Sequence, residues 1–536
     1  MKLKHACKKG VTLVLAGLMA AATLTACGSG SESTATAGAE SVTTETSTSS
    51  EATESTAVTE SDETLVMILE TEPKTLTNLN NASTLQVFPE AIGDSLLRYN
   101  DETKTADPCL AESYEMIDDT HYRFHLREDA VYSDGTPVTA DDVLYSLTQY
   151  KEVGVQDALM IDPANCVVED EHTFVLALET YKLGWEFCVA QGTTAIYSEA
   201  AVEAAGGVDA AGFAPVGCGR YKVSEWKPGE YLLVERNENY WDPDFVGYYK
   251  YIKFMFVSDS ASRVMAVRSG DADIANRISA ADYISLQNDP AAYGWAYDAG
   301  VVNNLYFNNE EGACTDEKLR EAICYAIDPE AVNAVMNLGM GEVAQGLWPK
   351  SFPFYRDYYG KTLYDPEKAK QLLAEAGYAS GLTLDLPVLS TFKDAATVVQ
   401  ENLRNVGVEV NVSVLDNATW TGLARGGDYD MLLGNTAIAS VNATMFNHVD
   451  PAKIGISAFS IRVDTPAINE GLALANSTDE ANQEEGFDKL YDEIFSNYYV
   501  LGLCNGNKYM AVKNGVTGLR VSNTYGYVDV SECHPE

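Results

Sequence analysis

Few residues of this sequence are of the types that carry out nucleophilic or metal chemistry. Beyond the first 26 residues, histidine occurs only at His121, His125, His172, His448 and His534. The sequence has no G-x-S-x-G nucleophile elbow, no H-E-x-x-H zinc motif and no Walker loop. His121 and His125 alternate with apolar residues, which predicts an exposed strand face rather than a metal pair. We therefore expect no catalytic residue, no metal ligand and no cofactor, and we expect His448 to be an exposed loop residue.

The cysteines leave two alternatives open. Cys7 and Cys27 belong to the first 27 residues, which have the layout of an export signal (next paragraph). Eight cysteines remain in the folded chain: Cys109, Cys166, Cys188, Cys218, Cys314, Cys324, Cys504 and Cys533. An even number in an exported protein fits disulfides. Their scattered spacing lacks the density of a disulfide-rich module and contains no C-x-x-C metal motif. Buried free thiols fit this spacing equally well.

The first 27 residues have the layout of an export signal. Four lysines precede an apolar run at residues 11–24, and the run is too short to be read as a membrane span. The sequence Leu24-Thr25-Ala26-Cys27 resembles a bacterial lipobox, in which the Cys receives a lipid and becomes the new N-terminus. We expect residues 1–26 to be a signal peptide and Cys27 to be a membrane anchor. Ordinary signal cleavage next to a coincidental Cys is the alternative.

Residues 27–62 and the overall charge describe the surroundings of the folded part. Residues 28–62 are rich in Ser, Thr and Glu and contain no Lys or Arg, so we expect a disordered spacer. Removing the four lysines of the leader changes the formal net charge from −43 to −47. Such a negative charge repels nucleic acid, and we expect no nucleic-acid partner. No later stretch approaches 18 uninterrupted apolar residues.

The hydrophobic pattern predicts a mixed α/β protein. Residues 64–69 form an apolar run typical of a buried strand. Thr139 and Asp142 have the spacing of a capping box at the start of a helix. Helical periodicity runs through 316–337, through 366–376 after the N-cap Asp365, and through 395–406, and a strand pattern follows at 408–415. Strands that alternate with helices in this way indicate α/β lobes.

Residues 122–143, with the sequence YRFHLREDAVYSDGTPVTADDV, resemble the signature of family 5 extracellular solute-binding proteins of ABC importers. Further similar blocks follow in the order of that family, at 75–78, 93–99, 215–221, 236–241, 268–273, 305–308, 319–328 and 428–431. The resemblance extends from about residue 65 to about residue 530. Several such blocks in the order of the family identify it far more specifically than any single block does.

The resemblance implies a two-lobed fold of the periplasmic-binding-protein type II kind, in its large three-subdomain form, with a hinge and a ligand cleft between the lobes. It places the first lobe at 63–310, with an inserted subdomain at about 99–195. The second lobe is expected at 311–497, and residues 498–536 return to the first lobe. Ligand binding would then favour a closed form that a permease recognises.

The resemblance also implies the function. We expect a monomeric lipoprotein outside the cytoplasm that captures a peptide-like or other small solute and delivers it to the permease and ATPase subunits of an ABC importer. Two alternatives come from other classes. One is an exported lipoprotein hydrolase, and the other is a surface sensor or adhesion protein that keeps the fold without transport.

The ligand-binding residues are expected in segments that the resemblance places at the cleft, where aromatic walls and a few polar groups are needed. They are Asn78, Asn81, Ser83, Trp348, Lys393, Trp420, Asn435, Thr436, Ile438 and Asn442. Peptide-binding members carry a Trp and, three residues later, an Asp that pairs with the ammonium group of the peptide. Asn435 and Ile438 occupy these positions here, so we expect no pairing of a free ammonium at Ile438. Lys393 is expected either to contact an anion or to start a helix at the surface.

Overall fold

The chain is a mixed α/β structure built around one large sheet. The computed structural model describes residues 61–80, 89–100, 102–103, 105–155, 157–350, 352, 354–358, 363–437, 448–521 and 528–536. The predicted signal peptide, the lipidation site Cys27 and nearly all of the predicted spacer lie outside these residues. So do four of the expected ligand-binding residues, Asn81, Ser83, Ile438 and Asn442. Residues 57–536 form one compact unit.

The large sheet has nine strands within the described residues, in the order β16-β12-β17-β11-β1-β10-β9-β8, and β13 pairs with β17. Strand β1 is parallel to β10 and β11, and the remaining pairs are antiparallel. The strands are β1 (Ser61–Leu69), β8 (Tyr221–Lys227), β9 (Tyr231–Arg236), β10 (Tyr249–Phe256), β11 (Ile274–Ile278), β12 (Ala292–Phe307), β13 (Glu342–Val343), β16 (Met431–Ala437) and β17 (Val500–Lys513).

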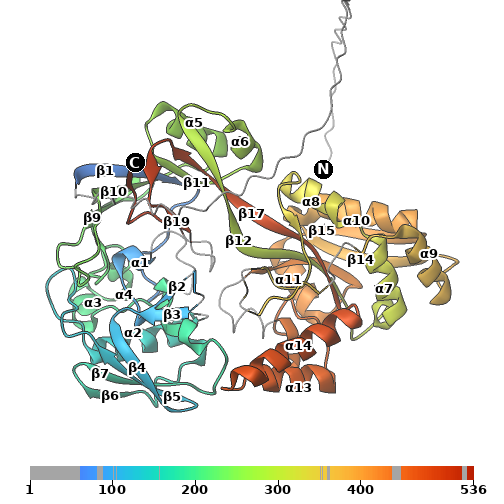
Figure 1. The fold of residues 1–536 in the computed structure, drawn as a ribbon, viewed down its shortest axis with the longest axis horizontal. Coiled ribbons are helices and arrows are strands. Elements are labelled where there is room, and N and C mark those ends of the chain that lie inside the picture. Colours follow the sequence, from blue (N-terminus) through green and yellow to red (C-terminus); the bar gives the residue numbers. More distant parts are fainter. Residues whose placement is uncertain are drawn as a thin grey trace, which may run out of the picture. The chain divides into compact units, whose positions relative to one another are not determined.

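Each face of the β1-β11-β17 region packs against its own core, because successive side chains of a strand point to opposite faces. Ile68, Ala275 and Tyr509 belong to the core under α5 (Ser260–Ser269) and α6 (Ala280–Ser285), the two helices beside β11 in Figure 1. Met67 and Met510 belong to the opposite core, which also contains Ala91 and Ile92 of α1 (Pro89–Ile92).

A second, antiparallel sheet of order β4-β5-β7-β6 encloses a separate core with α2 (Ala140–Val153). The predicted capping box is confirmed, since Thr139 Oγ1 accepts from Asp142 N and Asp142 Oδ2 accepts from Thr139 N. The elements of this region are β2 (Leu97–Asn100), β3 (Thr105–Pro108), β4 (Ala111–Asp118), β5 (His121–Leu126), β6 (Val167–Asp170), β7 (Thr173–Ala177), α3 (Glu199–Ala205) and α4 (Val208–Ala211).

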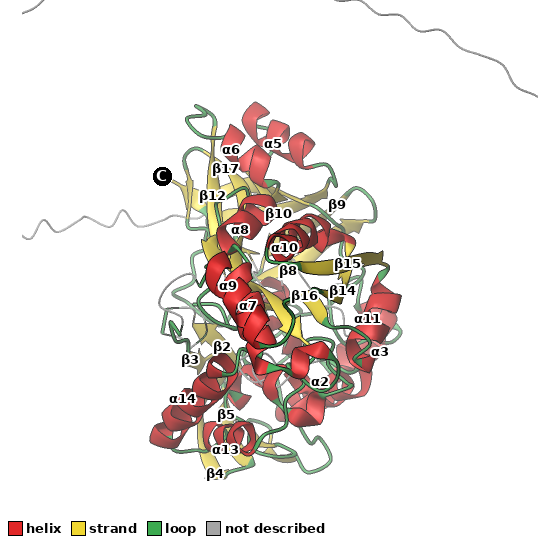
Figure 2. Ribbon diagram, turned by 90° about the vertical axis from the view of Figure 1, so that its right-hand side faces the viewer, coloured by secondary structure: helices red, strands yellow, loops and turns green. Residues whose placement is uncertain are grey.

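A third group of elements packs around β12 and β16 at the other end of the large sheet. The parallel pair β14-β15 and four helices share one core, and α7, α9 and α10 face the viewer in Figure 2. Helices α13 and α14 contribute to another core on the opposite side of β12. These elements are α7 (Glu317–Ala326), α8 (Pro329–Asn337), α9 (Pro366–Glu375), β14 (Leu382–Leu389), α10 (Lys393–Asn405), β15 (Val408–Leu415), α11 (Asn417–Gly426), α13 (Pro466–Ala475) and α14 (Glu480–Ser496).

The expected single helix over 316–337 is wrong in one respect, because the segment forms two helices, α7 and α8. Ile327 leaves the helix with an extended backbone, and Asp328 caps the next helix, which starts at Pro329. Proline has no amide hydrogen and disfavours helical conformation in the residue before it, so it ends one helix and starts another. The strand at 408–415, the helix at 395–406 and the Asp365 cap agree with the sequence expectation.

Candidate functional site

Two long antiparallel strands, β12 and β17, extend from the end of the sheet near α5 and α6 toward α11 and α14 (Figure 1). They pair from Ala292 with Lys513 to Tyr306 with Val500. The register shifts between Asp298 and Val301, where Gly300 has φ +63°, and again between Asn303 and Asn304. Such irregularities bend a paired ribbon locally, so β12 and β17 have the form of a hinge.

A buried polar network lies where β12 meets β16, beyond the second register shift. Asn304 Nδ2 donates to Thr436 Oγ1 at 2.9 Å. The hydroxyl groups of Tyr306 and Thr436 are 3.0 Å apart, and the Tyr306 hydroxyl lies 3.2 Å from His448 Nδ1. All four side chains are buried, and Asn304 and Thr436 are fully enclosed. Hydrogen bonding satisfies most of their polar atoms, which is the condition for burying such groups without a large cost.

His448 departs from its expected place in an exposed loop, since only 5% of its surface is accessible. Its Nδ1 lies 2.9 Å from the Phe459 carbonyl oxygen, which can only accept, so Nδ1 carries the proton in this contact. Burial lowers the pKa of His448 to about 4, although the Phe459 carbonyl opposes this effect. At neutral pH His448 is therefore an uncharged part of the network.

The two expected cleft tryptophans are both buried on the side of the sheet that contains Tyr306. Trp420, in α11, donates from Nε1 to the Pro387 carbonyl at 3.3 Å and packs against Phe459 at a ring distance of 5.6 Å. Trp348 is 1% exposed and stacks on Phe352 at 5.3 Å. The Trp348 Nε1 has no hydrogen-bond partner among the described residues.

The other expected residues that the structure describes are spread over the molecule. Asn78 is buried and donates from Nδ2 to the Thr193 carbonyl at 3.1 Å, while its Oδ1 has no partner in the described part of the chain. Asn435 is half-buried on β16, opposite Asn303 of β12. Lys393 is exposed as the first residue of α10.

The structure thus brings Thr436 and Trp420 into one cluster through Tyr306 and Phe459. Sequence reasoning did not select Asn304 or Tyr306, although block 305–308 contains the tyrosine. Their role depends on the pairing of β12 with β16, which are far apart in the sequence. The polar pair Asn303-Asn304 within the apolar stretch 301–307 is the one signal that could have pointed to them.

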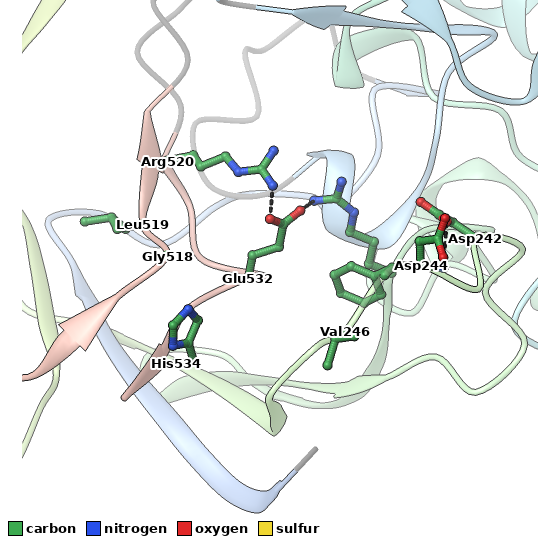
Figure 3. Close-up of a pocket in the computed structure, with 10 residues that line it drawn as sticks. Asp242, Asp244, Val246, Gly518, Leu519, Arg520, Glu532 and His534 are labelled. Atoms are coloured by element: carbon green, nitrogen blue, oxygen red, sulfur yellow. Dashed lines mark hydrogen bonds and ion pairs between the residues drawn. The ribbon is translucent and has the colours of Figure 1, made fainter. Parts of the chain in front are cut away.

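A pocket of about 620 Å³, lined by charged and apolar side chains, lies where residues 518–520, Glu532 and His534 face Arg220 and the segment 242–246. Figure 3 shows Glu532 between Arg520 and a second arginine, which is Arg220. Arg220 also contacts the Asp529 carboxylate at 3.0 Å, and the neighbouring Asp242 adds further negative charge. Because both arginines already have carboxylate partners, the pocket offers no uncompensated positive charge for a ligand.

The described residues contain no group of three or more His, Cys, Asp or Glu side chains placed to hold a metal ion. The eight cysteines, all within the described residues, are not joined in disulfides, and all but the half-buried Cys166 are buried. Among the helices that the structure describes, none combines the length and apolar character needed to span a membrane.

The fold and the long strand pair β12-β17 define a two-lobed binding protein. Residues 105–449 match the family described as bacterial extracellular solute-binding proteins, family 5, and the chain belongs to this family. The sequence-based assignment of the family is therefore confirmed, and so is the prediction of a binding protein rather than an enzyme.

Curated relatives carry different ligands in their names. The chain is 27% identical over 349 residues to the probable D,D-dipeptide-binding periplasmic protein DdpA of Escherichia coli, a match that covers 63% of this chain and 66% of the relative. It is 26% identical over 450 residues to heme-binding protein A of Haemophilus influenzae, covering 75% and 79%. The chain thus spans just under two thirds of the length of the first of these relatives.

Solved structures confirm the fold. HbpA2 of Haemophilus parasuis matches with a TM-score of 0.80 at 19% identity, covering 88% of this chain and all of the other. The agropinic acid complex of AgaA from Agrobacterium tumefaciens R10 matches with a TM-score of 0.67 at 26% identity, covering 88% and 99%. The α/β fold of the periplasmic binding proteins, expected from the sequence, is thereby confirmed.

Proposed function

We propose that the chain is a lipid-anchored extracytoplasmic protein that captures a small solute between its lobes and delivers it to the permease of an ABC importer. The observation that carries this proposal is the β12-β17 pair with its two register shifts. Two strands that bend at a few residues let two lobes close on a ligand as rigid bodies. Family membership and the absence of catalytic motifs support binding rather than chemistry.

The proposed division into lobes follows the same strands. We place the hinge near Gly300 of β12, close to the expected end of the first lobe at residue 310. The separate four-stranded sheet between Ala111 and Ala177 supports an inserted subdomain at about 99–195. The second lobe, 311–497, and the C-terminal return, 498–536, complete the division. One compact unit for 57–536 is compatible with a monomer.

The anchor is proposed from the sequence alone. Basic residues, an apolar run and Leu24-Thr25-Ala26-Cys27 support lipidation at Cys27, and residues 28–62 supply the length of a tether. In this arrangement the binding domain stays outside the cytoplasm near its permease and ATPase partners.

The ligand class is proposed from the relatives and from one residue. Relatives are named for D,D-dipeptides, heme and glutathione, and solved neighbours contain the peptide STSA or agropinic acid. We propose a small solute of this size range that carries no free ammonium at the position of Ile438, because an isoleucine gives a buried ammonium no partner.

The test combines thermal unfolding with X-ray scattering for five probes: D-alanyl-D-alanine, glutathione, hemin, the peptide STSA and agropinic acid. A bound solute raises the melting temperature in a concentration-dependent way and reduces the radius of gyration. Tight binding without contraction contradicts closure of the lobes. Chemical conversion of a probe favours the hydrolase alternative, and unchanged solute uptake after deletion of the gene favours the sensor or adhesion alternative.

A further inference from the structure

Two cations, Arg277 and Lys508, lie close together where β11 and β17 pair beside β12. Asn276 and Arg277 form a bulge in β11, between the pairs Ala275–Ala511 and Ile278–Tyr509. Arg277 adopts a left-handed backbone with φ +51°, which is uncommon for a residue with a side chain. Ile278 and Tyr509, the residues that directly follow the two cations, are paired in the sheet, so Arg277 and Lys508 lie at neighbouring positions of adjacent strands. The Arg277 charge accordingly acts on Lys508.

Neither cation has an acidic partner among the residues that the structure describes. The structure gives no ion pair and no side-chain hydrogen bond for either group in the described part of the chain. Burial and the Arg277 charge lower the pKa of Lys508 to about 8, and no described carboxylate opposes this shift. At neutral pH Lys508 is still mostly protonated, so the pair carries two positive charges. Two half-buried like charges without a counter-ion repel each other and are costly to keep.

This arrangement differs from that of several other arginines of the protein. Arg263 donates to the backbone carbonyls of Val257, Ser258 and Arg277. Arg320 likewise donates to backbone carbonyls, and the arginines of the C-terminal pocket pair with Glu532. With a formal charge of −43, the chain has ample carboxylates to neutralise a structural cation pair. The lack of a neutralising carboxylate at Arg277 and Lys508 therefore needs an explanation.

Alternation along β17 shows which way Lys508 points. Tyr509 packs in the core under α5 and α6, so Lys508 lies on the other face, together with Met510. Tyr297, the register partner of Lys508, is on this face as well. The same face packs against Leu76, two residues before the expected ligand residue Asn78. The cation pair is thus on the side of the sheet from which the expected cleft segment approaches.

The polar groups on the neighbouring strand positions bond elsewhere. The Tyr297 hydroxyl donates to Asn276 Oδ1 at 3.3 Å, so these two neutral groups bond to each other. Asp298 follows Tyr297, but alternation turns it to the opposite face, and its Oδ1 accepts from Gly300 N. A guanidinium and an ammonium side by side are suited to an oxyanion, because both supply charge-assisted hydrogen bonds.

We propose that Arg277 and Lys508 form an anion subsite that binds a carboxylate or similar acidic group of the captured solute. This inference rests on the proposed solute-binding function and narrows its ligand class to acids. Lys508 directly follows Asn507, whose partner Asp298 borders the first register shift of the hinge. The acidic end of the solute would then be fixed at the hinge, while the rest of the solute contacts both lobes.

The test uses glutarate and its neutral amide, glutaramide, which have the same length and differ in charge. Binding is followed by saturation-transfer NMR and calorimetry at a pH of about 6.5, where Lys508 is protonated. We expect glutarate to bind and glutaramide not to bind. Equal binding of the two compounds, or no binding of glutarate at high millimolar concentration, overturns the proposal.

Variants identify the groups responsible. Arg277→Gln and Lys508→Gln should each weaken glutarate binding by about tenfold or more, since each loses a charge-assisted bond. Lys508→Arg should retain binding, which separates loss of charge from misfolding. Lys370→Gln removes an exposed lysine that pairs with Glu367 and should change nothing. Unchanged binding in both charge-removing variants overturns the proposal.

The subsite and the proposed function fail in different ways. If a probe of the solute panel contracts the protein equally in wild type and in Arg277→Gln, the solute-binding function stands and the anion subsite is wrong. The converse result is that glutarate binds at the cation pair while no solute of the panel contracts the protein and no solute needs the protein for its uptake. In that case the anion subsite stands and the transport function is wrong.

Discussion

Tyr306 of β12 and Thr436 of β16 hold their hydroxyl groups 3.0 Å apart inside the protein, although 130 residues separate them in the sequence. Thr436 also accepts a hydrogen bond from Asn304 at 2.9 Å, so one small hydroxyl serves two buried partners. This contact joins the long strand β12 to β16, the edge strand that directly precedes Ile438 in the sequence.

Replacing Thr436 by valine keeps the shape of the side chain and removes its hydroxyl. Asn304 Nδ2 then loses its best acceptor, and we expect the free energy of unfolding to fall by about 1–3 kcal/mol. Urea denaturation measures the change. Thr436→Ser keeps the hydroxyl and should cost less than the valine variant. A valine variant as stable as the wild type would show that the network contributes nothing.

The histidine of this network makes stability depend on pH. The pKa of His448 is about 4 in the fold and about 6.5 in the unfolded chain, so the unfolded chain binds more protons between these values. The contribution of His448 is complete above pH 6.5 and is lost as the pH falls toward 4, by roughly 3 kcal/mol in total.

The measurement is urea denaturation of the wild type and of His448→Gln at several pH values between about 4 and 7. Carboxylates titrate in both proteins, so the difference between the two curves reports the histidine. We expect the wild type to lose more stability than the variant over this interval. Parallel curves would show that His448 titrates normally in the fold.

Much of the local structure could be predicted from the sequence. The capping box of Thr139 and Asp142 and the Asp365 cap depend on residues three or fewer apart, and both form as expected. The prediction that His448 is exposed was wrong, because its burial depends on contacts with Phe459 and Tyr306 and not on its neighbours in the sequence. Likewise, Arg277 and Lys508 come together only through the pairing of β11 with β17. Non-local strand pairing has no short-range signal in one sequence.

The buried thiols give a prediction about reactivity. Burial raises the pKa of Cys166 and Cys504 to about 11, and it raises those of Cys324 and Cys533 further. Because the thiolate is the reactive form, iodoacetamide should modify the native protein slowly. In denaturant without a reductant, mass spectrometry should show all eight folded-chain thiols alkylated. Alkylation in pairs only after reduction would instead demonstrate disulfides.

The proposed anchor is tested by Cys27→Ala in the full-length chain. Without the thiol no lipid can be attached, so we expect the protein to move from the membrane fraction to the soluble fraction. Cell fractionation with a salt wash measures the distribution, and Cys166→Ala serves as a cysteine control that should remain with the membrane. Membrane retention of Cys27→Ala after the wash would contradict lipidation at this residue.

The last prediction concerns Ile438, which stands where the resemblance places an ammonium-pairing Asp in peptide-binding members. If isoleucine takes that place, a peptide with a free N-terminus would bury an unpaired ammonium, which is costly. We expect weak or undetectable binding of ordinary short peptides by the wild type. Ile438→Asp restores a negative charge at the position without changing the anchor or the long strand pair β12-β17.

A good charge-assisted pair contributes about 1.5–3 kcal/mol, which corresponds to roughly ten- to a hundredfold in affinity. Calorimetry should therefore show that Ile438→Asp binds the peptide STSA more tightly than the wild type by a factor in this range. N-acetylation of the peptide should abolish the gain, because it removes the ammonium. Ile438→Asn is the matched uncharged control, and it should bind as weakly as the wild type. Micromolar binding of the free peptide by the wild type, lost on acetylation, would show that another acidic residue pairs with the ammonium and that the assignment of Ile438 is wrong.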